Sequence, residues 1–469
     1  MHQRFPVLRT SVIFATLFSA LPAMAATLAV GPGKTYATPC KAYAVAKAGD
    51  VVEITGNTTY SGDVCAIYAS NLTIRGVNGR PRIDAAGKNA LGKGTWVVVG
   101  SNVTVDNVEM LGAKVPDANG AAIRLEGTNF TLRNAYLHHN ENGILTGANA
   151  ASNVLIEYSE FGYNGGGTGQ THNLYIGKIG SLTFRYNFSH DANVGHNLKS
   201  RAQVNTIAYN RFSSSTGKPS YEIDLPNAGT SYIIGNVIHQ PAVHSNPNII
   251  AYGEEGASNP GHDLYIVNNT ILNDDSSRGN GVLVGSTVTK KILLQNNIYA
   301  GTGTLTNQSG AVEKTNYRAL APGFVNRAAF DLRPTTVGLV IDAGSAPGVS
   351  ASGLSLAPAA QYKHVAASEA RTVAGTIDIG AYEAASMTTT APTPTPTPTP
   401  TPSPDTVTWT MCATQNGPCH VPGTREVRYG AKGVYATKIV TDYVLCSSTV
   451  FGNPIPNVTK SCSYSSVVR

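Results

Sequence analysis

The sequence predicts an all-β solenoid in which short strands wind into parallel coils. Three observations indicate this class: one asparagine position recurs at intervals of 23, 26, 33 and 28 residues, its apolar neighbours keep the same register, and alternating strands lie between the repeats. The repeated segments read FRYNFS, IAYNRF, IIGNVI, IVNNTI and LQNNIY, with the shared residue at Asn187, Asn210, Asn236, Asn269 and Asn297.

Stacking gives the repeated asparagine a physical role. Equivalent side chains of neighbouring parallel coils lie about 4.8 Å apart. An inward column of amides can hydrogen-bond along the axis and satisfy the backbone at a tight bend, where asparagine also tolerates left-handed dihedral angles. We therefore expect these five residues to form a buried ladder.

A second set of strands alternates with the ladder segments. Its members are AAIRLEG (121–127), NGILTG (142–147), HNLYIG (172–177), HNLKSRA (196–202), SYEIDLP (220–226), NIIAYGEEG (248–256) and GVLVG (281–285). Earlier coils contribute NLTIRG (71–76), NVTVDNVEM (102–110), NFTLRNAYL (129–137) and NVLIEYSEF (153–161). At this period, residues 26–386 predict a solenoid of about ten coils.

The first 25 residues predict a signal peptide. Arg4 and Arg9 precede an apolar run from Val12 to Leu21, and Ala23-Met24-Ala25 has the small-x-small pattern of a cleavage site. The run is too short to span a membrane, and no other stretch approaches that length. We expect a secreted protein, extracellular or periplasmic, with no membrane partner after cleavage.

Residues 34–54 predict a cap for the first coil. They read as a short amphipathic helix beginning after Thr38 or Pro39, a Gly-Asp turn and a strand. A helix there would cover the unpaired edge groups of an exposed coil end. Cys40 on this helix and Cys65 in an early coil form one cysteine set, and we expect a disulfide between them.

The chain resembles right-handed parallel β-helix proteins of the pectin-lyase-like superfamily. Their N-terminal caps share the pattern PG…Ai..A..GD.v.v, and LVIDAGSAPG (339–348) and IDIGAYEA (377–384) are similar to their closing strands. The resemblance covers residues 29 to 384 and implies right-handed coils with three sheets. That fold hosts lyases, hydrolases, epimerases and adhesins, so the reaction must be argued from the site.

A linker and a small second module follow. Residues 387–404 are a Pro-Thr repeat, which predicts a semi-rigid spacer. Residues 405–469 need disulfides to be stable at this size, and the sequence leaves open the three pairings of Cys412, Cys419, Cys446 and Cys462. Containing Trp409 and several tyrosines, the module is similar to accessory carbohydrate-binding modules of extracellular enzymes; the alternative is that these aromatics fill its core.

The charge of the chain favours an acidic polymer over a nucleic acid. The formal charge of +6 falls to +4 when Arg4 and Arg9 leave with the signal peptide, and only 13% of residues are charged. No Lys/Arg-rich run suggests a nucleic-acid partner. We expect a monomer whose partner is a polysaccharide, and the mild basicity of the chain suits an acidic one.

Candidate site residues gather on three neighbouring strands, 172–177, 196–202 and 220–226. The predicted register places Lys199 between Tyr175 and Glu222, and Arg201 between Gly177 and Asp224, each step about 4.8 Å. His172 and His196 stand at strand entrances and His190 on the loop above. The predicted substrate-binding residues are His172, Asn173, Asn197, His190, Glu222, Asp224 and, from the next coil, Tyr252.

The favoured hypothesis is a lyase that cleaves a uronate-containing polysaccharide by β-elimination. This reaction needs a group that neutralises the carboxylate, a base for the C5 proton and an acid for the leaving oxygen. We assign these roles to Arg201, to Lys199, and to Tyr175 or His196. The resemblance implies lysine, arginine and sometimes calcium, although related lyases take the two cations from different coils. No metal-ligand residues are assigned; calcium is left open, although no aspartate cluster on adjacent coils supports it.

Two alternatives stay open. Glu222 and Asp224, about 6.6 Å apart along one strand, match the spacing of a glycoside hydrolase that inverts, with Glu254 or Glu255 joining them. In the other, the solenoid binds carbohydrate without catalysis, and Lys199–Glu222 and Arg201–Asp224 are surface ion pairs that stabilise little.

Overall fold

The computed structural model describes residues 25–276, 279–335, 339–384 and 408–468. The chain forms two compact units, Met1–Thr388 and Thr389–Arg469. Almost all of the predicted signal peptide and the whole predicted linker (387–404) lie outside the described residues. No helix in the described part of the chain is long and apolar enough to cross a membrane.

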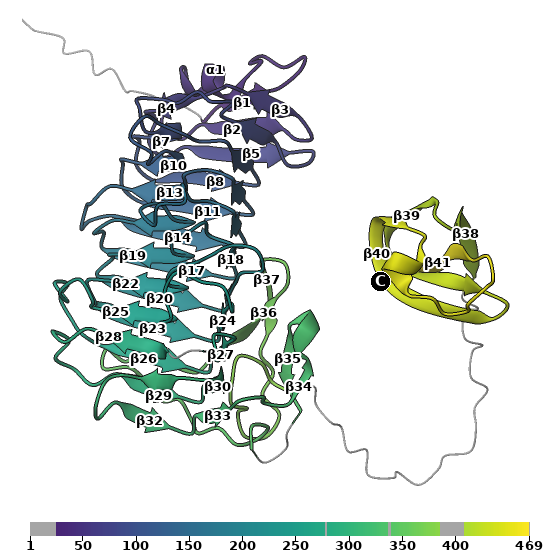
Figure 1. Ribbon diagram of the computed structural model, residues 1–469. Helices are drawn as coiled ribbons and strands as arrows, with labels where there is room; N and C mark the ends of the chain where they lie inside the picture. Colours follow the sequence, from purple (N-terminus) through teal and green to yellow (C-terminus); the bar gives the residue numbers. More distant parts are fainter. Residues whose placement is uncertain (1–24, 277–278, 336–338, 385–407, 469) are drawn as a thin grey trace, which may run out of the picture. The chain divides into compact units, whose positions relative to one another are not determined.

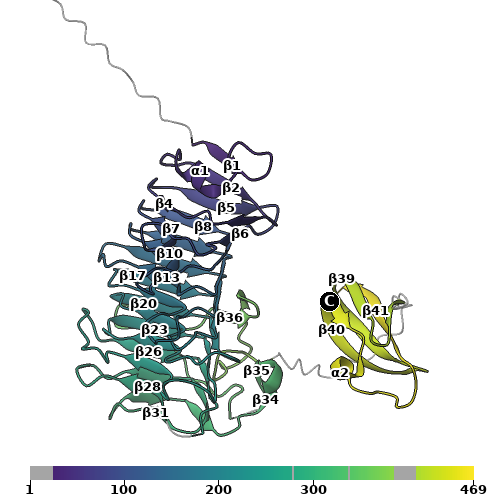
Figure 2. The ribbon, with the colours of Figure 1, turned by 45° about the horizontal axis from the view of Figure 1, so that its top comes forward.

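The first unit is a parallel β-helix with three sheets as walls (Figures 1 and 2). The twelve-stranded sheet contains β1 Thr27–Val30, β2 Val51–Thr55, β5 Thr73–Val77, β8 Val103–Asp106, β11 Phe130–Arg133, β14 Asn153–Glu157, β17 Ser181–Arg185, β20 Val204–Ala208, β23 Thr230–Ile234, β26 Leu264–Val267, β29 Leu293–Gln295 and β32 Val312–Lys314. The ten-stranded sheet contains β4 Cys65–Ile67, β7 Gly94–Val98, β10 Ala121–Leu125, β13 Asn142–Thr146, β16 Leu174–Ile176, β19 Leu198–Ser200, β22 Ile223–Leu225, β25 Ile250–Tyr252, β28 Asn280–Val284 and β31 Thr304–Thr306. The eleven-stranded sheet contains β3 Thr59–Ser61, β6 Arg82–Asp84, β9 Glu109–Leu111, β12 Tyr136–His138, β15 Glu160–Gly162, β18 Phe188–His190, β21 Arg211–Ser213, β24 Val237–Gln240, β27 Thr270–Asn273, β30 Ile298–Gly301 and β33 Tyr317–Ala319.

Stacking turns these short strands into one continuous core. In the ten-stranded sheet, for example, Ile123 pairs with Ile144 and Ile144 with Leu174, and all three side chains are fully buried. A strand of three to five residues buries too little apolar surface to be stable alone, but each coil covers the next. The predicted all-β solenoid of about ten coils is confirmed.

The predicted asparagine ladder is also confirmed. All five side chains are fully buried, at the corner that precedes the eleven-stranded sheet. The backbone N–H of Asn187 donates to Oδ1 of Asn210 at 2.9 Å, and the same bond repeats along the column as far as Asn316. Each amide thus satisfies the bend of the neighbouring coil.

The left-handed residue of these corners is not the ladder asparagine. Positive φ angles fall on the residue before it, as at Tyr186 (62°), Tyr209 (57°) and Asn268 (52°). The expectation that the ladder residue itself exploits this conformation was therefore wrong. Its side chain must point inward while the preceding residue turns the chain.

The predicted cap is present at the first coil. Helix α1 spans Pro39–Tyr43 with Thr38 at its N-cap position, and β2 follows the Gly-Asp turn. Cys40 and Cys65 form the expected disulfide. Carboxylate oxygens of Asp50 accept backbone N–H groups of Ala26 and Lys47, which fixes the turn between helix and strand.

The predicted closing strands at 339–348 and 377–384 are not strands. These segments are irregular and pack against the outside of the helix. Nδ2 of Asn268 donates to the carbonyl of Asp378, and the N–H of Ala381 donates to Oγ1 of Thr270. Two hairpins accompany them: β34 Phe324–Asn326 with β35 Asp331–Pro334 around the 3-10 helix η1 Arg327–Ala329, and β36 Ala360–Lys363 with β37 Ala367–Ala370.

The second unit is an antiparallel sheet in the order β38-β41-β39-β40, and Figure 1 labels these four strands. The strands are β38 Trp409–Thr414, β39 Pro418–Ala431, β40 Val434–Leu445 and β41 Ser461–Val468, and helix α2 spans Ser448–Phe451. Disulfides Cys412–Cys419 and Cys446–Cys462 resolve the pairing that the sequence left open.

Candidate functional site

The strands β16, β19 and β22 bring the predicted site residues together in a corrected register. Lys199 lies between Tyr175 and Asp224, not between Tyr175 and Glu222. The alternation of inward and outward residues was predicted correctly within the three strands, but not at the corners that precede them, and β22 is shifted by two residues. Arg201 therefore lies beyond the strand, and it does not pair with Asp224.

The two-residue shift of β22 arises because Glu222 lies at the corner of the coil that precedes this strand. Asn173, Asn197 and Glu222 are fully buried and continue a second ladder of side chains that starts with Asn140 and Asn164. Nδ2 of Asn197 donates to Oε2 of Glu222 at 2.5 Å. The expectation that these three side chains bind substrate was wrong, because they point into the interior.

Burial also determines the protonation of Glu222. Removal from water raises the pKa of its carboxyl to about 8, although the hydrogen bond from Asn197 opposes the shift. Its Oε1 is buried and has no hydrogen-bond partner among the described residues. Glu222 is thus a neutral, interior carboxyl group at pH 7, and the Glu222/Asp224 pair of the hydrolase alternative does not face a substrate.

Tyr252 is another corrected prediction. It pairs with the inward residue Leu225, and its ring is fully buried. The hydroxyl donates to the carbonyl of Gly229 at 2.7 Å. Tyr252 is part of the core and cannot contact a substrate outside the helix.

A buried lysine carries the charge of the site. Nζ of Lys199 lies 2.8 Å from Oδ2 of Asp224 and 2.8 Å from Oε1 of Glu255. Burial alone would lower the pKa of Lys199, but the two carboxylates outweigh it and raise that pKa. Burial raises the pKa of Asp224 despite its lysine partner. Lys199 is therefore held as an ammonium group.

Arg201 lies in the same cluster of side chains as Tyr175, Lys199 and Asp224. We call these four residues the Lys199 wall. Its Nε donates to the Tyr175 hydroxyl at 2.8 Å, one terminal nitrogen to Oδ1 of Asn227 at 2.7 Å, and the other to Oε2 of Glu255 at 2.5 Å. Because Tyr175 accepts from Arg201, its own O–H proton stays free to be donated. Three side chains thus hold the guanidinium plane in one orientation.

Glu255 bridges the two cations. One carboxylate oxygen contacts Lys199 and the other contacts Arg201, while the side chain is 47% exposed. Burial alone would raise the pKa of Glu255, but hydrogen bonds from both cations lower it. Its backbone N–H donates to the carbonyl of Pro226, so the carboxylate can leave by side-chain rotation alone.

Two histidines stack beside the wall. The rings of His172 and His196 lie 4.6 Å apart and almost parallel. The backbone N–H of His196 donates to Nδ1 of His172, and that of Tyr221 donates to Nδ1 of His196. The proton of each neutral ring is therefore on Nε2, and Nε2 of His196 lies 3.4 Å from Oδ2 of Asp224.

The histidines remain neutral at physiological pH. Burial and the charge of Lys199 lower the pKa of His172 to about 3, and burial lowers that of His196 well below its usual value. His196 was a predicted catalytic acid, but it lacks the imidazolium proton that this role needs. Its N–H instead orients the Asp224 carboxylate.

His190 does not lie on this wall. It ends strand β18 of the eleven-stranded sheet, where the sequence predicted a loop. Its Nδ1 is 2.7 Å from Oδ2 of Asp191 and its Nε2 is 3.1 Å from Oε1 of Glu160. Its ring nitrogens contact these two carboxylates, and the structure places His190 on a different sheet from Lys199 and Tyr175.

Sequence reasoning missed Asn227 and underrated Glu255. Asn227 was not considered, and Glu255 was considered only as a partner in hydrolysis. Both follow the ends of strands, in turns after β22 and β25. Polar residues at equivalent turns of adjacent coils were the available signal, but the two-residue shift of β22 concealed their proximity to Arg201.

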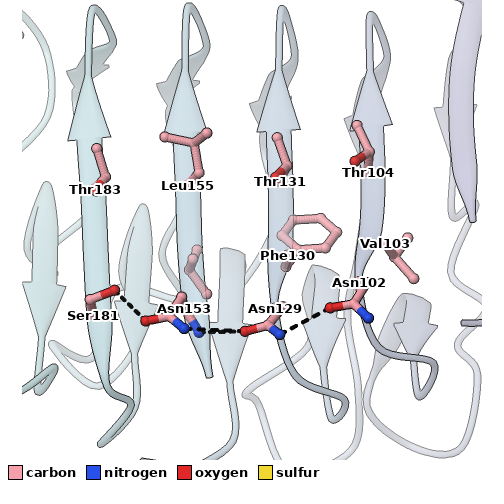
Figure 3. A pocket seen from close by; sticks show the side chains of 11 residues that line it. Asn102, Val103, Thr104, Asn129, Phe130, Thr131, Asn153, Leu155, Ser181 and Thr183 are labelled. Carbon is pink, nitrogen blue, oxygen red and sulfur yellow. Dashed lines mark hydrogen bonds between the residues drawn. The ribbon is translucent and has the colours of Figure 1, made fainter. Parts of the chain in front are cut away.

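A separate groove lies on another sheet of the solenoid. An open groove of about 450 Å³ on the twelve-stranded sheet is lined by residues of β8, β11, β14 and β17 (Figure 3). Nδ2 of Asn129 donates to Asn102, and the hydroxyl of Ser181 donates to Asn153. The lining contains no titratable side chain, so this groove offers no acid or base.

Within the described ranges, no group of three or more His, Cys, Asp or Glu residues has the arrangement of a metal site. Calcium therefore has no candidate ligands on this wall beyond Asp224 and Glu255, and both carboxylates already contact Lys199.

Comparisons with known proteins concern the fold. No known family and no curated protein matches the sequence. The structure is similar to pectate lyase Pel9A, with 15% identity, 77% of this chain and 96% of that chain covered, and a TM-score of 0.56. It is also similar to an alginate lyase from Paenibacillus sp. str. FPU-7 (13% identity, 63% and 99% covered, TM-score 0.40) and to tailspike protein gp49 of Acinetobacter baumannii bacteriophage Fri1, a capsular polysaccharide depolymerase (10%, 91% and 81%, TM-score 0.36). The chain thus shares the parallel β-helix fold of pectate lyase Pel9A.

Proposed function

We propose that the first unit is a secreted lyase that cleaves a uronate-containing polysaccharide by β-elimination on the wall formed by Tyr175, Lys199, Arg201 and Asp224. The contact of Glu255 with Lys199 and Arg201 carries this proposal. A carboxylate already bridges the two cations, and a uronate presents the same group. The pectate lyase fold and the disulfides are compatible with this substrate class and with export.

Substrate binding starts with an exchange of carboxylates. The uronate carboxylate replaces Glu255 on Arg201, whose remaining bonds to Tyr175 and Asn227 keep the guanidinium in place. Arg201 then stabilises the negative charge that develops when the C5 proton leaves. Departure of Glu255 also removes one of the two carboxylates that keep Lys199 protonated.

Lys199 then acts as the base. Its ammonium proton passes to Asp224, which is 2.8 Å away and whose pKa is raised by burial. The neutral amine takes the C5 proton, the C5–H electron pair forms the C4–C5 double bond, and the C4–O bond breaks. Tyr175 donates its hydroxyl proton to the leaving oxygen. Lys199 is an ammonium group again after this step. Asp224 then releases its extra proton to solvent and Tyr175 takes one from solvent, which returns both side chains to their starting states.

The burial of Glu222 weighs against the hydrolase alternative. Inversion by two carboxylates requires both groups to flank the scissile bond.

Ultraviolet absorbance tests the proposal, because elimination leaves an unsaturated uronate and hydrolysis does not. Incubation with polygalacturonate or alginate should raise the absorbance, and Lys199→Ala or Arg201→Ala should abolish the rise. Lys178→Ala, an exposed lysine shortly after β16, is the matched control and should keep full activity. New reducing ends without absorbance would show hydrolysis, and binding without either product would show a non-catalytic solenoid; both contradict the proposal.

A further inference from the structure

The second unit carries a row of aromatic and cationic side chains that are half-buried or exposed. Cζ of Arg428 lies 4.3 Å from the ring centroid of Trp409 and 4.4 Å from that of Tyr435. Val427 and Tyr429, on either side of Arg428, are buried in the core of the unit. Alternation along β39 therefore places Arg428 on the opposite face of the sheet. We call Trp409, Arg428 and Tyr435 the Arg428 platform.

Small residues form the floor of the platform. Gly430 pairs with Tyr435, and a Cβ atom at Gly430 would lie 2.8 Å from Cδ1 of that ring. Ser463 pairs with Arg428, and Ser465 pairs with Trp409. Large side chains at these positions would lift the rings from the sheet. The sequence thus allows two rings and a guanidinium to lie side by side over three strands.

Charge and exposure indicate what the platform can bind. Tyr435 is 39% exposed, and Arg428 is half-buried, with a buried Nε that has no hydrogen-bond partner within the described residues. Residues 405–469 contain six Lys or Arg and three Asp or Glu, which gives a charge of +3. The whole chain without residues 1–25 has +4, so most of its excess positive charge belongs to this unit.

We propose that the Arg428 platform is a binding site for an acidic polysaccharide, separate from the Lys199 wall. Sugar rings pack on Trp409 and Tyr435, while a carboxylate of the polymer contacts Arg428. A tethered second site raises the effective concentration of the first unit on its polymer. The choice of a carboxylate polymer rests in part on the proposed function; the charge of the unit supports it independently.

Binding of the full chain to immobilised polygalacturonate and alginate tests this site. Lys199→Ala serves as the background, so that cleavage does not remove the ligand. Trp409→Ala and Tyr435→Ala should each weaken binding about three- to tenfold. Arg428→Gln keeps both rings and should weaken binding and its dependence on salt. Tyr443→Ala, at a 52% exposed tyrosine eight residues further along β40, is the matched control and should bind normally.

Several outcomes separate this inference from the proposed function. Unchanged binding by both aromatic variants and by Arg428→Gln would overturn the platform. Equal affinity for cellulose would overturn the acidic ligand class. Weaker binding by the platform variants supports the site even if no polymer is cleaved. In the otherwise unmodified chain, platform variants should cleave short soluble oligosaccharides at the normal rate. If a variant loses its thermal transition together with binding, the loss of binding is due to unfolding, which would contradict a direct contact.

Discussion

Lys199 lies directly across from Asp224, with Nζ 2.8 Å from Oδ2, and both side chains are almost completely buried. A buried pair of this kind is costly to break, because the remaining charge stays out of water. Substitutions in this pair are therefore expected to change both the stability of the coil and the activity of the proposed base, Lys199.

Asp224→Asn should reduce both stability and activity. The free energy of unfolding should fall by about 3 kcal/mol, because Lys199 keeps only the exposed partner Glu255. Loss of the proton acceptor should lower kcat by about 100-fold or more. Urea unfolding and initial rates measure the two effects.

A double-mutant cycle provides the control for this pair. Lys199→Met should cost much less stability in the Asp224→Asn background than in the unmodified chain. Additive losses would show that the two side chains are not coupled, contrary to their contact in the structure.

Glu255→Gln should improve substrate binding. An exposed ion pair contributes up to about 1 kcal/mol, so removal of this competing carboxylate should lower KM up to about fivefold. Glu254→Gln, at the exposed neighbouring glutamate, should leave KM unchanged. A higher KM or a lost kcat for Glu255→Gln would mean that Glu255 takes part in catalysis instead of occupying the substrate position.

Glu222→Gln should remove a pH dependence of stability. The folded-state pKa of about 8 lies above the unfolded value, so the folded state binds the proton more tightly. Stability is then highest below the unfolded pKa and falls as the pH rises toward 8, by on the order of 4–5 kcal/mol in total. The variant, which can still accept the bond from Asn197, should melt at a higher temperature than the unmodified chain at pH 8 and at a similar one near pH 4.

Thermal melts between pH 4 and pH 8 measure whether stability depends on the protonation of Glu222. Glu53→Gln, which changes only an exposed ion pair with Arg75, should follow the unmodified chain. An unmodified chain that is as stable at pH 8 as at pH 5 would show that Glu222 is not held neutral.

The period of the sequence was enough to predict the coils, because each residue of the asparagine ladder satisfies the same bend in its neighbour. Alternation was likewise enough to identify the inward side of β16, β19 and β22. The asparagine period repeats from coil to coil, and the alternation is local to each strand. Both predictions were correct for the ladder asparagines and for the inward residues of the three strands.

The register of β22 could not be predicted in this way. A shift of two residues preserves the alternation, so apolar periodicity cannot distinguish Glu222 from Asp224 as the partner of Lys199. The decision depends on the corner, where Asn197 contacts Glu222. The contact between Arg201 and Glu255 crosses 54 residues, and no local pattern encodes it.

The ladder itself yields a final prediction. Asn210 is fully buried; it accepts from the N–H of Asn187 and donates to the carbonyl of Phe184. Asn210→Ala leaves both groups unsatisfied, at about 1–3 kcal/mol each, so urea unfolding should show a loss of about 2–6 kcal/mol. Asn153→Ala removes an exposed amide from the outer row in Figure 3 and should cost less than about 1 kcal/mol. Equal losses for the two variants would mean that burial of the ladder does not determine its contribution, because both amides bond along the same stacking direction and differ mainly in their access to water.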